Sequence, residues 1–454
     1  MSFLASLSRE QKEAIGLLQI GTFLEYFDLM LYVHMAVLLN ELFFPKTDPH
    51  TAALLSAFAF CSTFVLRPFG ALLFGYIGDT IGRKHTVIIT TMMMAVSCVI
   101  MANLPTYAQV GITATWVVTI CRILQGLSSM GEMMGAQIYI TEITKPPVQY
   151  PAVSFISVAS SLGATVALGV GVLVTTTGFN WRIAFWVGAA VAMVGSLART
   201  KLRETPEFVD MKRRLQHVIE TKNNHNINST SSHIQKIRQL IQKGQQEKVC
   251  TRTLAAFSVI YCGWPLSFFL LYMYFNPLLK ERCGYISEDI IFHNFILSLL
   301  MLCSEYVWSK LSYRIHPLRI LKKRGIGFLI FTLPLPFLVL HCTSWVHIFT
   351  LQCLILLFQL GYFPAPSVFI KHFPVFKRFT ATSFLYALTR AVMYIFTSFG
   401  IVYLTEWFSY YGLWLMLFPI TLSYLWGVYH FEMLEQQTEH DRYDMNECVY
   451  NYAP

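Results

Sequence analysis

The stretch Gly21-Thr-Phe-Leu-Glu25-Tyr-Phe-Asp28-Leu-Met-Leu-Tyr32 lies inside a long apolar run and carries two carboxylates three residues apart. In a helix, Gly21, Glu25, Asp28 and Tyr32 fall along one face. Placing one ionised carboxylate at the centre of a bilayer costs about 2.5–3.5 kcal/mol on insertion scales. Two of them on one face therefore predict either a buried polar pair that packs helices together, or a transporter face that binds protons and substrate.

The composition around this stretch is that of a membrane protein. The chain has 454 residues, of which 55% are hydrophobic and 13% are charged, whereas a soluble domain carries about 25% charged residues. Apolar runs of about twenty residues, long enough to cross a bilayer as helices, recur along the chain. No cleavage site of small residues follows the first run, so we interpret it as a retained span rather than a signal peptide.

The apolar runs predict an all-α polytopic membrane protein with twelve transmembrane helices in two six-helix halves, because isolated spans must satisfy their own backbone in lipid. A segment rich in Lys, Arg, Asn, Ser, Gln and His separates the halves. We expect an N-terminal half over 1–200, a cytoplasmic linker over 201–252, a C-terminal half over 253–432 and a cytoplasmic tail over 433–454. The predicted spans cover residues 14–40, 51–77, 86–103, 111–138, 152–176, 182–200, 253–279, 288–311, 325–341, 346–370, 379–404 and 410–431.

Basic residues are concentrated in alternate connections between the predicted spans. One set includes Arg83, Lys84, Lys145 and the run from Lys310 to Arg324. The other set is poor in them, and the connections 104–110, 177–181, 342–345 and 405–409 hold none. Basic loops face the cytoplasm, so both termini are expected there.

Several classes of function are disfavoured by the same composition. The net charge of +9 comes from basic residues at span ends rather than from one patch, which argues against a nucleic-acid partner. The ten cysteines are scattered without a CxxC pair, so we expect no metal site and no disulfide. No cluster of nucleophile and base is evident, so we do not expect an enzyme.

The connection after the second predicted span reads Gly75-Tyr-Ile-Gly-Asp79-Thr-Ile-Gly82-Arg83-Lys84. It is similar to the G-x-x-x-D-x-x-G-R-K/R signature of the major facilitator superfamily, in which it forms a cytoplasmic gate. Glycines at its two ends permit close approach and a tight turn, and Asp79 is suited to pairing with an arginine across the gate or to capping a helix. The resemblance implies a gate made by Gly75, Asp79, Gly82, Arg83 and Lys84.

The fourth predicted span carries Arg122-Ile-Leu-Gln125-Gly126-Leu-Ser-Ser129-Met-Gly131-Glu132, which looks like the superfamily's span-four motif. An arginine inside a membrane needs a partner. We therefore expect Arg122 to pair with Glu25 or Asp28, unless it only braces the helix bundle. The pattern leaves open which carboxylate carries a proton, and Glu132 is a third candidate.

Finer features resemble one subfamily, the metabolite:H⁺ symporters, which includes proline/betaine, α-ketoglutarate, citrate and shikimate carriers. The resemblance is dense over residues 15–210 and rests on Thr22–Tyr32, Arg67-Pro68-Phe-Gly70 and Leu202–Phe208. The second half departs from the pattern, since Leu311-Ser312-Tyr313-Arg314 lacks the Asp and Gly of the repeated gate. The fold therefore carries over, whereas the substrate does not, because half of a central site comes from the divergent half.

These observations predict a secondary active transporter that imports a small polar metabolite with protons, by alternating access. The expected substrate is an organic acid or a zwitterion resembling proline or betaine. Exporters of the superfamily often carry a Gly-Pro kink in the fifth span. The fifth predicted span here has no proline, so the resemblance favours import over export, and it implies the inner membrane of a bacterium. Export of a drug or secreted metabolite is one alternative, and a transport-inactive sensor or scaffold is another.

The expected site divides into two overlapping sets. Proton coupling is assigned to Glu25, Asp28, Arg122 and Glu132. Substrate binding is assigned to Glu25, Tyr26, Asp28, Tyr32, Arg122, Gln125, Tyr272, Tyr386 and Arg390. The sequence leaves open whether Arg390 clamps an anion, snorkels or pairs with Glu305. We expect no cofactor other than the coupling protons, and the expected partners are the small-molecule substrate and the lipid bilayer, with the protein a monomer.

Overall fold

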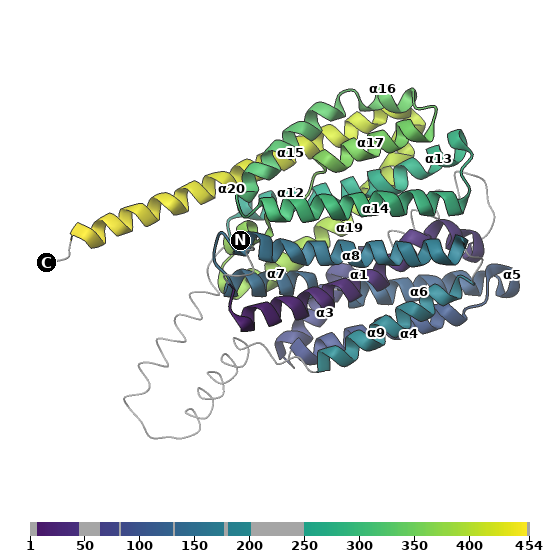
Figure 1. Ribbon diagram of the computed structural model, residues 1–454, viewed down its shortest axis with the longest axis horizontal. Coiled ribbons are helices and arrows are strands. Elements are labelled where there is room, and N and C mark those ends of the chain that lie inside the picture. The colour runs from purple at the N-terminus through teal and green to yellow at the C-terminus, as the bar shows by residue number, and fades with distance from the viewer. Residues whose placement is uncertain are drawn as a thin grey trace, which may run out of the picture.

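A computed structural model describes residues 7–44, 64–80, 83–129, 132–176, 180–200 and 249–451. Long helices run side by side in a bundle, with α1 to α9 in the lower part of Figure 1 and α12 to α20 in the upper part. Residues 201–248 of the predicted 201–252 linker and residues 51–63 of the predicted 51–77 span fall outside the described residues.

The first part of the chain forms helices that follow the predicted spans. The 111–138 span is described as two helices, α6 and α7, on either side of residues 130–131. The helices are α1 (Arg9–Phe43), α3 (Arg67–Thr80), α4 (Arg83–Asn103), α5 (Tyr107–Val110), α6 (Ile112–Ser128), α7 (Glu132–Ile143), α8 (Gln149–Thr176) and α9 (Arg182–Thr200).

The second part of the chain is also helical and more broken. The elements are α12 (Thr251–Phe269), η2 (Leu270–Tyr274), α13 (Phe275–Cys283), α14 (Ser287–Leu311), α15 (Pro317–Thr332), α16 (Leu335–Leu340), α17 (Trp345–Phe358), α18 (Pro366–Lys371), α19 (Val375–Phe408), η3 (Ser409–Tyr411) and α20 (Gly412–Asn451). Figure 1 shows α20 continuing beyond the bundle, at the end where the N-terminus lies.

Several element boundaries differ from the predicted spans, and the clearest differences concern α15, the α17–α18 region and α20. Helix α15 begins at Pro317 rather than at 325, because proline suits the first turn of a helix and basic residues extend it outside the apolar run. The 346–370 span is interrupted after Phe358, where a segment containing Pro364 separates α17 from α18. Helix α20 continues well past the predicted end of the last span at 431.

Within the described residues, five helical segments are long and apolar enough to cross a membrane. They are Arg9–Leu31, Gln149–Val174, Thr251–Cys283, Ser287–Leu311 and Thr380–Thr438. Shorter apolar helical segments are Met92–Asn103, Arg182–Val191 and Trp345–Phe358. The apolar character and the helical architecture together match a multi-pass membrane protein.

Small residues set how closely the helices approach one another. A Cβ added at Gly163 of α8 would collide with the carbonyl oxygen of Phe23 in α1, so α1 and α8 pack backbone to backbone. A Cβ at Gly70 of α3 would lie 2.5 Å from the carbonyl oxygen of Leu127 in α6. The first contact fixes α1, where the carboxylates lie, against α8, and the second holds α3 against α6.

Contacts between the two parts of the chain follow two main seams. Helix α8 packs along α14, and α3 packs along α19. The short helix α18 touches α7 and α8. A buried polar centre lies where these seams meet α1.

Candidate functional site

Two predicted substrate residues from opposite ends of the chain meet at the centre of the bundle. The hydroxyl oxygens of Tyr26 in α1 and Tyr386 in α19 lie 3.2 Å apart. Arg390, one turn further along α19, donates from Nη1 to the Tyr26 hydroxyl at 3.3 Å. Their exposed fractions are 4%, 3% and 1%, respectively, so the contact is buried. The structure therefore brings Tyr26, Tyr386 and Arg390 together as one group.

Aromatic rings surround the guanidinium of Arg390. Its Cζ lies 4.4 Å from the ring centroid of Trp264 and 4.5 Å from that of Tyr386. A desolvated arginine over aromatic faces gains about 2 kcal/mol from each favourable contact. Behind these rings, Tyr261 and Tyr362 stack with their centroids 4.4 Å apart. Of the three roles that the sequence left open for Arg390, this burial excludes snorkelling.

Glu305, the alternative partner for Arg390, has different neighbours. It is buried in α14, where the Ser161 hydroxyl of α8 bonds it and the charge of Arg324 in α15 acts on it. Arg324 itself donates from Nη1 to the carbonyl oxygen of Phe363 at 3.2 Å. Glu305 and Arg324 thus form a separate polar group beside the central one.

A second buried arginine, Arg67, was not among the predicted site residues. It begins α3, is 2% exposed, and its Cζ lies 4.3 Å from the ring centroid of Phe64. That ring packs at 4.0 Å from the ring of Tyr394 in α19. Arg67 stands in the stretch Arg67-Pro68-Phe-Gly70, inside a predicted span, and an arginine within a span is by itself a sign of a functional site.

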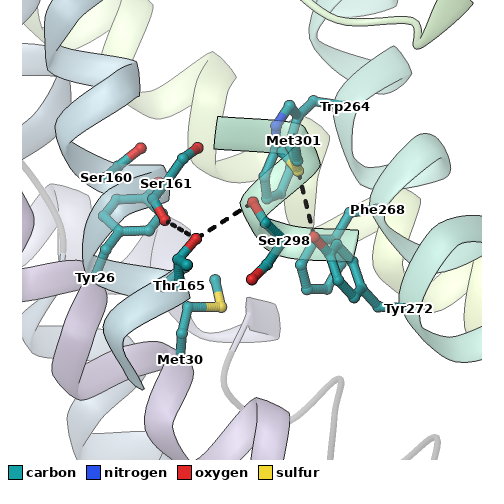
Figure 2. A pocket seen from close by; sticks show the side chains of 11 residues that line it. Tyr26, Met30, Ser160, Ser161, Thr165, Trp264, Phe268, Tyr272, Ser298 and Met301 are labelled. Carbon is teal, nitrogen blue, oxygen red and sulfur yellow. Dashed lines mark hydrogen bonds between the residues drawn. The ribbon is translucent and has the colours of Figure 1, made fainter. Parts of the chain in front are cut away.

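A small cavity of about 30 Å³ opens beside this centre. Figure 2 shows side chains of α1, α8, α12, η2 and α14 converging on it, with Tyr26 and Trp264 on opposite sides. A buried water needs roughly 10–15 Å³, so this space fits about two waters. Its lining residues are Tyr26, Met30, Ser160, Ser161, Ala164, Thr165, Trp264, Phe268, Tyr272, Ser298 and Met301.

Hydrogen bonds around this cavity join the two parts of the chain. The hydroxyl of Thr165 in α8 donates to the carbonyl oxygen of Ser161 at 2.8 Å and to that of Ser298 in α14 at 3.4 Å (Figure 2). The predicted substrate residue Tyr272 lies in the π-helical turn η2 and donates to the Met301 sulfur at 3.5 Å. A π-helical turn often marks a functional site because it redirects side chains.

A second cavity of about 10 Å³ lies next to the first and is more polar. Tyr26 and Tyr386 belong to its lining, and Glu25 and Arg67 face it together. It has room for about one water. The full lining is Glu25, Tyr26, Arg67, Ser129, Met133, Met134, Ser383 and Tyr386. Both of these cavities, as lined by the described residues, are small.

The two carboxylates of α1 face different surroundings. Glu25 and Asp28 are 5% and 3% exposed. Glu25 lines the cavity that contains Arg67. Asp28 turns toward α9, where its Oδ1 would lie 3.3 Å from a Cβ added at Gly188, and its charge acts on Cys98 of α4. Glu25 thus faces the seam between the two parts of the chain, and Asp28 faces the helices of the first part.

Two of the predicted span-four residues, Arg122 and Gln125, lie in α6 and are buried. Arg122 is 1% exposed and Gln125 is 0% exposed. The amide nitrogen of Gln125 donates to the Cys98 sulfur at 3.6 Å, which places this face of α6 near the side of α1 that carries Asp28. The ion pair of Arg122 with Glu25 or Asp28 stays a prediction.

For the other predicted residues, the structure describes only the backbone or does not describe the residue. Tyr32 belongs to α1 and Glu132 begins α7, but their side chains are outside the described part. Gly75 and Asp79 lie in α3, Arg83 and Lys84 begin α4, and Gly82 falls between them outside the described residues. The gate assigned to these residues therefore stays a prediction.

A described contact at the same end of the bundle does join the two parts of the chain. Arg378 of α19 donates from Nη1 to Glu142 of α7 at 2.8 Å, with both side chains less than 20% exposed. Nearby, the Ser154 hydroxyl in α8 donates to the carbonyl oxygen of Pro364 at 3.0 Å. The amide of Gln11 bonds the carbonyl of Ile143 at 2.7 Å, so this is the end where α1 begins. The bundle is closed there.

Fold and site together define a multi-pass helical membrane protein with a buried polar centre between two packed helical bundles. The sequence model described as Major Facilitator Superfamily matches residues 18–398. The chain belongs to that superfamily and has its fold, with transmembrane helices in two halves. We call α1 to α9 the N-terminal half and α12 to α20 the C-terminal half.

Curated relatives share part of the chain. It is 34% identical over 42% of its length to the inner membrane metabolite transport protein YhjE of Escherichia coli, covering 45% of that protein. It is 32% identical over 43% of its length to the proline/betaine transporter of Salmonella typhimurium, covering 41% of that protein. The matched part therefore spans less than half the length of these relatives.

Solved structures share the fold over nearly the whole chain. The proton:xylose symporter XylE, in a structure bound to 6-bromo-6-deoxy-D-glucose, aligns with a TM-score of 0.69 at 16% identity, covering 91% of this chain and 94% of that one. At this identity the likeness concerns the fold alone.

Proposed function

We propose that this protein is a secondary active transporter that imports a small polar metabolite together with protons, by alternating access, in the inner membrane of a bacterium. The observation that carries the proposal is the hydrogen bond between Tyr26 and Arg390, which closes a polar centre built from both halves. A transporter of this fold binds its substrate at such a midplane site and opens it to each side in turn. The relatives, which transport proline/betaine and metabolites, support small metabolites as the substrate class.

Glu25 is our preferred candidate for the residue that binds the coupling proton. Glu25 and Arg67 line the same small cavity, so the charge of one bears on the other. Protonation of Glu25 removes a negative charge that faces Arg67, which leaves the guanidinium available to a substrate group. Proton and substrate then bind to one electrostatic network, and each changes the affinity for the other. Asp28, Arg122 and Glu132 remain further candidates in this network.

The alternating step is a rocking of the halves about the two seams. The closed end held by Glu142 and Arg378 is the one that carries the basic loops, which we assign to the cytoplasm together with both termini. Opening toward the cytoplasm must break that ion pair and separate α8 from α14. The bond from Thr165 to the Ser298 carbonyl lies on the same seam. A movement of α8 away from α14 therefore changes the central cavity at the same time as it breaks the Glu142–Arg378 contact.

Uptake into proteoliposomes with an imposed pH gradient tests this function. Succinate, proline and glycine betaine would serve as labelled solutes, with wild type, Glu25→Gln and Asp28→Asn compared. We expect an acidic outside to drive accumulation in wild type and Glu25→Gln to abolish that drive. Glu432→Gln, which changes a carboxylate of α20 remote from the centre, is the matched control.

Two results would contradict the proposal in different ways. If gradient-driven uptake survives both Glu25→Gln and Asp28→Asn, the proton assignment is wrong although transport remains. If the purified protein binds one of the solutes but transports none of them under any gradient, the protein is not a carrier of that solute class.

A further inference from the structure

The two arginines at the centre come from opposite halves and act on one another. Arg67 of α3 is 2% exposed and Arg390 of α19 is 1% exposed. Arg67 lines the second cavity with Tyr26 and Tyr386, and Arg390 bonds the Tyr26 hydroxyl and lies over the ring of Tyr386. The charge of Arg390 also acts on Arg67, and both arginines act on Tyr26, Tyr386 and Tyr394. Two like charges therefore share one aromatic cage, where the low dielectric makes their repulsion larger than it is in water.

Some N–H donors at the edges of the two guanidinium groups lack a hydrogen-bond acceptor. Aromatic faces cover Arg67 at Phe64 and Arg390 at Trp264. Within the described part of the chain, Nε and Nη2 of Arg67 and Nε of Arg390 have no hydrogen-bond acceptor. Buried donors left in this way are costly unless something accepts from them. The guanidinium edge is also the side that binds a carboxylate through two parallel hydrogen bonds.

A buried hydroxyl supplies a further unused donor at the same place. Ser383 of α19 lines the second cavity with Arg67 and is 7% exposed. Its Oγ has no hydrogen-bond partner among the described residues. The cavity therefore gathers a cation and a hydroxyl donor, which is the chemistry that an anionic oxygen group requires once Glu25, which also lines it, is protonated.

We propose that this centre binds the carboxylate of a net-negative organic anion between Arg67 and Arg390, with Ser383 as an additional donor. The proposal rests on the proposed transport function and specifies its substrate class. A bound carboxylate accepts from both guanidinium edges and offsets the repulsion between them. Because the arginines belong to different halves, binding the anion also holds α3 against α19.

A zwitterion of zero net charge fits the same cage less well. Its cationic group would need an aromatic face or a carboxylate. Glu25 is the carboxylate in the second cavity, and in the proposed cycle it is protonated when substrate binds, so it then offers no negative charge to such a group. The faces of Trp264 and Tyr386 that meet the centre are covered by Arg390. Tyr261 and Tyr362 stack on each other with an interplanar angle of 8°. The cage thus favours a ligand with negative charge in excess.

Thermal unfolding of the purified full-length protein in detergent tests the anion site without requiring transport. The probes are succinate, lactate, proline, glycine betaine and inorganic phosphate at constant ionic strength. Succinate or lactate should raise the Tm of wild type in a saturable manner. Arg67→Gln and Arg390→Gln should each raise the half-saturating concentration about tenfold or more, as expected for loss of a charged hydrogen bond.

Variants that keep charge or burial separate binding from folding. Arg324→Gln removes a buried arginine of α15 that bonds Phe363 rather than the cage, so its half-saturating concentration should equal that of wild type. Arg67→Lys and Arg390→Lys keep the charge without the planar fork, and should bind the anion with intermediate affinity.

The outcomes distinguish this inference from the transport proposal. Stabilisation by proline or glycine betaine alone, or an unchanged succinate response in both Gln variants, would overturn the anion site even if the protein is a transporter. If phosphate raised the Tm as strongly as succinate does, the claim that the site is specific for organic anions would be overturned. Saturable succinate binding that depends on both arginines, without uptake under any gradient, would support the site and overturn the transport proposal.

Discussion

Glu142 at the end of α7 and Arg378 near the start of α19 form an ion pair at 2.8 Å that joins the N-terminal and C-terminal halves. Both side chains are partly shielded from solvent, which makes the pair stronger than an exposed one. Glu142→Gln should shift the equilibrium toward the conformation open at this end by about 1 kcal/mol, or about fivefold. Distances between spin labels on α7 and α19, measured in detergent, would report the shift.

A matched variant separates gating from loss of charge alone. Lys322 and Glu432 form a pair at 2.7 Å that lies wholly within the C-terminal half. Glu432→Gln should therefore leave the distance between α7 and α19 unchanged. Equal distance distributions in wild type and Glu142→Gln would show that the Glu142–Arg378 pair does not hold this end closed.

Tyr26→Phe should impair transport while leaving the fold intact. The change removes the hydroxyl that accepts from Arg390 and meets Tyr386, but it keeps the ring. Loss of one such buried bond costs about 0.5–1.5 kcal/mol of stability, so the Tm should fall only modestly. Uptake should fall much more, because Arg390 loses the bond that joins it to α1.

Tyr424→Phe provides the control for that change. Its hydroxyl donates to the carbonyl oxygen of Gly361 at 2.8 Å within the C-terminal half. A comparable loss of stability with normal uptake is expected. If both variants lose uptake in proportion to their Tm, the Tyr26–Arg390 bond has a structural role only.

The spans could be predicted because each one depends on local composition. An apolar run of sufficient length must be helical in lipid, so α8 and α14 follow directly from the chain. The predicted start of α15 was less accurate because hydropathy measures the apolar run rather than the helix. The helix begins at Pro317 and passes through Lys322 and Arg324 before it becomes apolar.

The site could be predicted only in part because it depends on how two halves meet. Tyr26, Tyr386 and Arg390 were each proposed from the sequence, and they contact one another in the structure. Arg67 was missed although an arginine within a span needs a partner, since periodicity within one helix does not say which face meets the other half. For the same reason, the sequence does not show that Glu25 and Asp28 have different surroundings.

Gly163→Ala should destabilise the protein through the packing of α1 against α8. The added methyl group would collide with the carbonyl oxygen of Phe23, and backbone cannot move aside as a flexible side chain does. Overpacking of this kind costs about 1–3 kcal/mol. The Tm in detergent would measure the loss, and Gly16→Ala is the control because its added Cβ meets no atom within 4 Å beyond its chain neighbours and the nearby backbone of its own helix. A Tm for Gly163→Ala equal to that of Gly16→Ala would contradict the close packing of these helices.

Anion affinity should rise as the pH falls, and Glu25 should be the group responsible. Ionised Glu25 faces Arg67 across the second cavity and competes with a substrate carboxylate, whereas protonated Glu25 does not. One linked proton changes the affinity by at most about tenfold per pH unit. In Glu25→Gln, succinate should bind with the high affinity of the acidic state at every pH.

Asp28→Asn should keep the pH dependence, because Asp28 faces α9 and α4 instead. Succinate titrations followed by the Tm at several pH values would test this prediction. If the affinity were independent of pH in Asp28→Asn but dependent on pH in Glu25→Gln, the linked proton would be assigned to Asp28.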